Sequence, residues 1–253
     1  MECSLSNAEK DRYRRQLILP EIGEKGQQRI KRASVLIAGL GGLGSLAAAY
    51  LAAAGVGHLK IVDMDRVAEH NLNRKLLHAT ADVGTLKTDS ARARLTALNP
   101  WCHIDAITAR IDDRNVGAMA SGCDLVLDGT DNIATRRVLH RAARYEGIPF
   151  IFGAVGGFDG MVATFVPGRA ACLECLFPAD GDRPRDEIGV IGPAVGVIAS
   201  LQSIEAVKIL LGYAPELKGL LVHFHGLGMR IGKTVVEPNP GCRVCSGNRP
   251  TVR

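Results

Sequence analysis

The chain has 253 residues, 47% hydrophobic and 23% charged, and this ordinary globular composition excludes a disordered tail, a collagen-like chain and a coiled coil. Lys and Arg number 31 against 26 Asp and Glu, so the formal net charge is +5, and no long basic run concentrates it. Aromatic residues make up only 4% of the chain, so neither basic charge nor base stacking favours a nucleic acid as the partner.

The first segment, residues 1–32, is polar and predicts a helical arm. The stretch 33–57 carries no charged residue and is long enough to suggest a membrane span. Six glycines divide this stretch into a strand, a turn and a helix, so we expect no membrane contact. The first residues show no basic segment followed by an apolar one, and we therefore expect a cytoplasmic protein.

Segments typical of strands and of helices alternate along much of the chain. The expected strands cover 33–38, 58–63, 103–109, 124–128, 149–154, 161–167, 220–225 and 229–236. The expected helices cover 43–54, 84–98, 132–146 and 193–212. This alternation predicts a mostly parallel sheet covered on both faces, with a mixed, antiparallel C-terminal part. We expect one α/β domain over 33–247, with the arm 1–32 before it and a short tail, 248–253, after it.

A glycine-rich turn lies between the first expected strand and the first expected helix. Gly39, Gly41 and Gly44 form the pattern G-x-G-x-x-G, and Gly42 adds a further glycine. Such glycines let backbone N–H groups approach a phosphate at the positive end of the helix. Asp63 ends the next strand, where an acid reaches ribose hydroxyls. The pattern indicates a nucleotide but does not separate NAD from ATP, and a tight turn without a ligand is the alternative.

Polar and charged side chains after that strand favour ATP. Asp65, Asn71 and Arg74 follow within a few residues, and Lys87 lies in the first turn of the next helix. A cation at a helix N-terminus opposes the helix dipole, and a nearby anion would offset that cost. Arg and Lys at these positions would neutralise the charge of a triphosphate. The alternatives are a surface ion pair for Arg74 and a solvated surface lysine for Lys87.

A second polar segment, Thr130-Asp131-Asn132, ends another strand at the edge where ligands of open α/β sheets bind. We expect Asp131 to hold Mg²⁺ and Asn132 to contribute to the nucleotide site. The alternative for Asp131 is a helix N-cap.

Two cysteine pairs, Cys172-x₂-Cys175 and Cys242-x₂-Cys245, have the spacing of metal ligands. Four thiolates predict a tetrahedral, structural Zn²⁺ site, because no coordination position is left open. A redox pair and an iron–sulfur cluster are the alternatives. The other cysteines, at positions 3, 102 and 123, are expected to be buried small apolar residues.

Taken together, the motifs resemble the MoeB/ThiF/HesA family of adenylyltransferases, bacterial relatives of ubiquitin-activating enzymes. The similarity runs from about residue 11 to residue 247 and rests on Arg12-Tyr13-x-Arg15-Gln16, the glycine-rich turn, Asp63 to Arg74, Lys87, Asp128-x-Thr130-Asp131-Asn132, Gly153-Ala154 and both cysteine pairs. The resemblance implies a doubly wound, Rossmann-like fold that forms a homodimer. It implies an ATP- and Mg²⁺-dependent reaction that joins AMP to the C-terminal carboxylate of a ubiquitin-like sulfur-carrier protein of the MoaD/ThiS type, ending in Gly-Gly, and releases pyrophosphate.

The resemblance also assigns roles to single residues. It implies the following contacts: the ribose for Asp63, the phosphates for Gly42, Asn71, Arg74 and Lys87, and Mg²⁺ for Asp131. Asp65 belongs with the nucleotide contacts. Arg15 is similar to the family's arginine that reaches across the dimer into the other subunit's site.

Three positions depart from the family pattern. Arg185 stands where many relatives carry a cysteine, within the polar stretch 178–190, which we expect to form a mobile loop. A thioester or acyl-disulfide on this loop is therefore not expected, and another protein would transfer sulfur. Lys75 replaces the family's usual Gln and is expected to be tolerated. Gly157 stands where many relatives have Arg, so recognition of the substrate tail is expected to differ.

Adenylation of a sulfur carrier, for molybdopterin, thiamine or thiolated-metabolite synthesis, is thus the main functional hypothesis. The principal alternative is the same chemistry on a ribosomal peptide or another carboxylate or amide in natural-product maturation, which Arg185 and Gly157 favour. A non-catalytic scaffold and an NAD-dependent oxidoreductase are weaker alternatives, because the cations needed to bind a triphosphate are all present. A tRNA-modifying relative is a weaker alternative because the sequence has no basic stripe.

Overall fold

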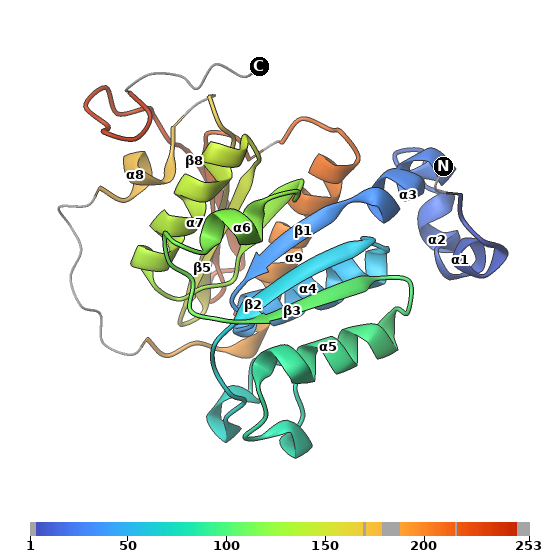
Figure 1. Cartoon of the computed structure of the whole chain (residues 1–253). Coiled ribbons are helices and arrows are strands. Elements are labelled where there is room, and N and C mark those ends of the chain that lie inside the picture. The colour runs from blue at the N-terminus through green and yellow to red at the C-terminus, as the bar shows by residue number, and fades with distance from the viewer. Residues whose placement is uncertain (1–3, 169–170, 179–187, 216, 247–253) are drawn as a thin grey trace.

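The computed structural model describes residues 4–168, 171–178, 188–215 and 217–246. Its centre is an eight-stranded sheet with the order β3-β2-β1-β4-β5-β6-β7-β8 (Figure 1). The strand bounds are β1 Ser34–Ala38, β2 His58–Asp63, β3 His103–Thr108, β4 Leu125–Asp128, β5 Phe150–Gly156, β6 Asp159–Phe165, β7 Leu220–His225 and β8 Arg230–Val235. Strands β1 to β5 pair in parallel, and β5 to β8 pair antiparallel. The expected mostly parallel sheet with an antiparallel C-terminal part is confirmed.

Helices cover both faces of the sheet. Their bounds are α1 Asn7–Arg12, α2 Arg14–Leu17, α3 Gly23–Arg32, α4 Gly42–Ala54, α5 Lys87–Leu98, α6 Val116–Ala120, α7 Ile133–Glu146, α8 Leu173–Leu176 and α9 Gly192–Leu210, with 3₁₀ turns η1 Glu69–Asn71 and η2 Thr80–Asp82. All five residues of β1 are buried, because its alternate side chains face two different cores. Val35 and Ile37 pack with Leu51 of α4, whereas Leu36 packs with Leu139 of α7. The sheet is therefore doubly wound.

The N-terminal arm is helical, as expected, and buried polar contacts hold its helices together and join it to the domain. Ser6 and Glu9 form a reciprocal capping box at the start of α1. Glu9 is only 2% exposed and pairs with Lys31 of α3, with 2.6 Å between Oε1 and Nζ. Tyr13 is buried, and its hydroxyl accepts a hydrogen bond from the Asn99 side chain. In Figure 1 the arm lies at one end of the molecule, beyond β1.

Several boundaries differ from the expected ones. The helix expected over 84–98 begins only at Lys87, because Gly84 adopts φ +86° and residues 82–86 form a turn against Arg66 and Val67. The short helices α6 and α8 and both 3₁₀ turns were not predicted, since segments of three to five residues carry no periodic pattern.

Of the helices that the structure describes, α9 alone has the length and apolar composition of a membrane span. Half of its residues are buried, and it packs against α4 and β5 in the core. The uncharged stretch 33–57 is divided into β1, a turn and α4, as expected.

Candidate active site

The glycine-rich turn and the segment 129–132 meet at the carboxyl edge of the sheet. They follow β1 and β4, which are neighbours in the sheet, and the chain then passes to opposite faces, into α4 and α7. Such a divergence opens a crevice in which α/β proteins bind their ligands. A Cβ atom added to Gly39 would lie 2.8 Å from the Gly129 carbonyl oxygen, so the two turns are in direct contact.

The conformation of the turn requires glycine. Gly39 has φ +85°, which side chains rarely adopt, and a Cβ atom on Gly44 would collide with the Gly39 carbonyl oxygen. Gly41 is the N-cap of α4 and Gly42 its first residue, and no side chain caps the helix. The first backbone N–H groups of α4 are therefore available to an anion.

Two acids and a lysine form a cluster beside this turn, in which the side chains of Asp63 and Lys87 are buried and that of Asp65 is exposed. Asp63 accepts hydrogen bonds from the backbone N–H groups of Leu40 (2.7 Å) and Asp65 (2.8 Å). Lys87, only 4% exposed, reaches Asp65 Oδ2 at 2.6 Å and Asp63 Oδ1 at 3.5 Å. The alternative of a solvated surface lysine is therefore wrong. Lys87 stands at the start of α5 because the acids compensate its charge.

Arg74 lies between the turn and the start of α9, near Gly42 and Gly192, and Asn71 ends the 3₁₀ turn η1 before it. Asn71 is 5% exposed, and its side-chain amide has no hydrogen-bond partner within the described ranges. Arg74 donates to the His70 carbonyl oxygen and to Asn73 Oδ1, and it makes no ion pair with a carboxylate in the described part of the chain. The surface ion pair considered for Arg74 is therefore wrong, and both side chains keep binding capacity.

Lys75 adds a cation that the sequence analysis treated only as a tolerated replacement. Its side chain is 8% exposed. Burial, together with the neighbouring cations of Lys87 and Arg74, lowers the pKa of Lys75 from 10.5 to about 8. Its position next to Arg74 in the motif is the signal that could have identified it.

A buried ion pair between Asp128 and Arg136 stabilises the turn after β4. Asp128 is fully buried and accepts from Arg136 Nε (2.9 Å) and from the Thr130 hydroxyl (2.6 Å). Arg136 also donates to the carbonyl oxygens of Thr130 and Gly153. These contacts fix the backbone that presents Asp131. Sequence reasoning missed Arg136, because one arginine in a polar helix carries no distinguishing signal.

Asp131 and Asn132 lie exposed at the start of α7. Asn132 is the N-cap, and its side chain accepts from the Thr135 N–H at 2.9 Å. The alternative of Asp131 as the N-cap is therefore wrong. The Asp131 carboxylate receives only a 3.4 Å contact from Asn132 Nδ2, which leaves oxygen ligands for a hard cation.

Arg15 lies away from these residues. The neighbouring Gln16 donates to the carbonyl oxygen of Ala54, at the C-terminal end of α4. The glycine-rich turn is at the other end of this 13-residue helix, about 20 Å away. Arg15 is exposed on α2 and does not join the cluster of its own chain.

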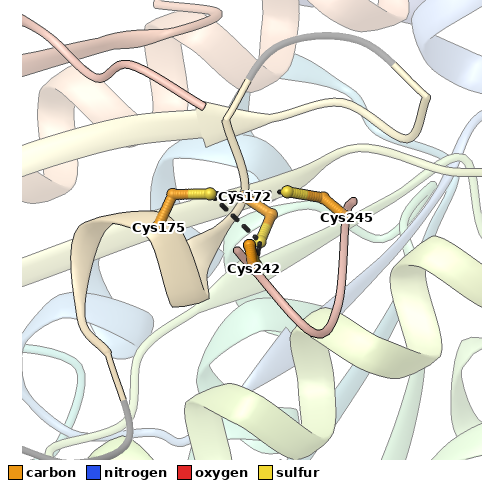
Figure 2. A group of neighbouring side chains, drawn as sticks. All are labelled: Cys172, Cys175, Cys242 and Cys245. Carbon is orange, nitrogen blue, oxygen red and sulfur yellow. Dashed lines mark hydrogen bonds between the residues drawn. The ribbon is translucent and has the colours of Figure 1, made fainter. Parts of the chain in front are cut away.

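The four predicted cysteine ligands converge (Figure 2). Their Sγ atoms are 3.8 Å apart for Cys172–Cys175, 3.5 Å for Cys172–Cys242 and 3.4 Å for Cys175–Cys245. Thiolates around a tetrahedral Zn²⁺ at about 2.3 Å lie roughly 3.8 Å apart, so the cluster fits zinc.

Contacts from α7 hold both halves of the cysteine cluster. Arg137 pairs with Glu174 at 2.9 Å, next to Cys175, and Arg144 donates to the Val244 carbonyl oxygen. Burial would raise the pKa of Cys242, but backbone N–H groups of Val244 and Cys245 lower it to about 7, whereas burial raises the pKa of Cys172 and raises that of Cys245 to about 11. Thiolate is the metal-binding form.

Three remaining predictions have different outcomes. Cys102 and Cys123 are buried, as expected, and burial raises the pKa of Cys102 to about 12. Cys3, Arg185 and most of the loop 178–190 lie outside the described residues. Gly157 has φ +60°, a backbone conformation that favours glycine. At the end of that loop, its N–H donates to the Gly189 carbonyl oxygen, and its carbonyl oxygen accepts from the Ile191 N–H.

The chain matches the ThiF family over residues 13–244. It is 44% identical to the sulfur carrier protein adenylyltransferase of Thermus thermophilus, over 97% of this chain and 93% of that one. It is 39% identical to the SAMP-activating enzyme E1 of Haloferax volcanii, over 97% and 92%. It is 40% identical to the molybdopterin-synthase adenylyltransferase of Escherichia coli, over 96% and 99%.

A solved structure with a similar fold is E. coli MccB with ATP, with a TM-score of 0.84 at 23% identity, covering 96% of this chain and 76% of that one. PaaA has a TM-score of 0.80 at 25% identity, covering 94% and 77%.

Proposed function

The chain belongs to the ThiF family, and on this basis we propose that it is an ATP-dependent adenylyltransferase acting on a ubiquitin-like sulfur carrier of the MoaD/ThiS type. The carrier's C-terminal carboxylate attacks the α-phosphorus of ATP. A carboxylate oxygen–phosphorus bond forms, the bond to the β-phosphate oxygen breaks, and pyrophosphate leaves. The product is a carrier acyl-adenylate.

The observation that carries the proposal is the set of groups at one sheet edge. The free N–H groups of α4, the buried Lys87 and the Asn71 amide, which has no hydrogen-bond partner among the described residues, all follow neighbouring parallel strands. A carboxylate nucleophile needs no protein base, so alignment and charge neutralisation are what the protein must supply.

Individual roles follow from the chemistry of each group. Asp63 holds the ribose, with Asp65 and Asn132 as further nucleotide contacts. The glycine-rich turn, Asn71, Arg74 and Lys87 bind the phosphates. Asp131 holds Mg²⁺, which supplies charge neutralisation on the phosphate oxygens.

A homodimer would complete the site. Arg15 is too far from its own chain's cluster, but an exposed arginine can serve a partner's site. Large apolar side chains are exposed on the arm, α4 and α9: Ile18 is 66% exposed, Tyr50 51% and Ile204 58%. An adjacent apolar cavity of about 650 Å³ lies between the arm, α4 and α9. Such a patch is typical of an interface.

The zinc is structural in this proposal, because four thiolates leave no position for a substrate. The cysteines that the structure describes form no disulfide, which is consistent with a reducing cytoplasm. We propose that neither nucleic acid nor membrane takes part.

The test is mass spectrometry of candidate carriers after incubation with the enzyme, ATP and Mg²⁺. A carrier ending in Gly-Gly should gain one AMP, and removal of its last glycine should abolish the product. An AMP adduct on a short precursor peptide instead would support the alternative substrate class. Gly157, in place of the arginine of many relatives, is the observation that favours this alternative.

A further inference from the structure

Three metal-ligating side chains lie together at the opposite edge of the sheet from the nucleotide site. His58 starts β2 and His103 starts β3, and the two are direct partners in the parallel register. Asp105 follows His103 by two residues and therefore lies on the same face of the sheet. We call His58, His103 and Asp105 the strand-edge triad.

The donor atoms of the triad converge. His58 Nε2 is 2.8 Å from Asp105 Oδ2, and His103 Nε2 is 3.0 Å from Asp105 Oδ1. All three ligand atoms lie within 4.8 Å of one another. Nitrogen and oxygen ligands of a tetrahedral zinc ion lie about 3.3 Å apart, so the two His–Asp distances differ from those of a coordination site by only a few tenths of an ångström.

A chain of hydrogen bonds leads from His58 into the protein. Cys123 donates its S–H to the Met119 carbonyl oxygen at 3.6 Å, which leaves its sulfur to accept from the Ser34 hydroxyl at 3.8 Å. The Ser34 hydroxyl oxygen also lies 3.2 Å from His58 Nδ1 and can accept from a ring N–H there, in the tautomer that would free Nε2 to bind a metal ion.

In that tautomer the electron pair of His58 Nε2 faces a carboxylate oxygen of Asp105 2.8 Å away. Two acceptors at this distance require a cation between them, either a second ring proton or a metal ion. A metal-bound histidine with its other nitrogen donating to an oxygen is the usual arrangement in metal sites.

No lysine or arginine neutralises Asp105 within the described ranges. Lys60, its partner in the register, donates instead to the carbonyl oxygens of Met119 and Ser121. His103 is 72% exposed and Asp105 44%, so an ion can enter from solvent, and water can fill the remaining positions.

We propose that the strand-edge triad binds a divalent transition-metal cation such as Zn²⁺. Two imidazoles and one carboxylate suit zinc, copper or nickel better than magnesium or calcium, which prefer oxygen ligands. The site would link the edge strand β3 to β2. It is independent of the adenylation site, because the six residues of β2 separate the two by roughly 20 Å.

The test is calorimetric titration of Zn²⁺ into protein whose cysteine cluster already holds one zinc. One further equivalent should bind per chain, and His103→Gln should weaken it at least tenfold without changing pyrophosphate exchange. Excess Zn²⁺ should also raise Tm in the wild type but not in His103→Gln. His103 is largely exposed, so the variant should fold.

His225→Gln is the matched control, since His225 also faces a carboxylate, Asp159, but at 3.7 Å and outside the triad. It should leave the second equivalent unchanged. Absence of a second equivalent, or one that survives in both His58→Gln and His103→Gln, would overturn the proposal.

Discussion

Among the proposed site residues, Asp131 is the one whose replacement should disturb the fold least. Because Asn132 caps α7, Asp131→Ala removes no structural hydrogen bond except the long contact at 3.4 Å. We expect carrier-dependent pyrophosphate exchange to fall about 100-fold or more, the range for loss of one group that organises transition-state charge. Tm and zinc content should match the wild type, and a drop in either would show that Asp131 is structural.

Lys75 predicts a pH dependence of ATP binding. Its pKa of about 8 means that the ammonium loses its proton just above neutral pH in the free enzyme. A bound triphosphate would favour the charged form, so ATP affinity should fall as pH rises above 8, by at most about tenfold per unit. Lys75→Gln should flatten this dependence, measured as Kd between pH 7 and 9.5. An equal slope in the variant would contradict the prediction.

The lowered pKa of Lys75 also determines whether its contribution to the free energy of unfolding rises or falls with pH. An unfolded Lys75 keeps its proton up to about pH 10.4, whereas the folded one releases it near pH 8. Between these values the unfolded state binds more protons, so the contribution of Lys75 to the free energy of unfolding increases with pH.

The sequence could identify Lys87 and Asp63, because the strand–turn–helix pattern places them at one edge. It could not show that Lys87 is buried and paired with two carboxylates, or that the Lys75 side chain is buried near it. Both depend on how the segment after β2 folds back onto the sheet edge. Arg136 became visible only through its contacts with Asp128.

At the scale of elements, the cysteine cluster joins α8 to the segment 242–245. We expect about one tightly bound Zn per chain after dialysis against metal-free buffer, which would empty the exposed strand-edge triad. Cys172→Ser should lose this zinc and lower Tm, because metal binding contributes directly to folding. Cys123→Ala, a buried cysteine outside the cluster, should keep it. Elemental analysis that finds iron or no metal would rule out the zinc site.

Elements with a long periodic pattern were the predictable ones. The strands 58–63 and 220–225 have the expected bounds, and α4 and α7 differ from theirs by one residue. The start of α5 could not be predicted, because it depends on the pairing of Arg66 with Leu86. The short α8 is held by Arg137 and Glu174, a contact between distant segments.

At the scale of the whole molecule, the distance of Arg15 from its own site predicts complementation between subunits. Arg15→Ala and Asp131→Ala should each be inactive alone. A mixed dimer contains one site with both residues intact, so random re-assortment of equal amounts should restore about a quarter of wild-type activity. No recovery, despite mixed dimers detected by native mass spectrometry, would place Arg15 outside the partner's site.

The central claim is that this chain activates a carrier carboxylate with ATP. The most direct measurement is ATP–pyrophosphate exchange with the purified protein, Mg²⁺ and Gly-Gly-ended carriers from the same genome. We predict exchange that depends on one carrier and on Lys87 and Asp131. Binding of ATP without exchange for any carrier would contradict the account and shift the substrate to a peptide or another carboxylate.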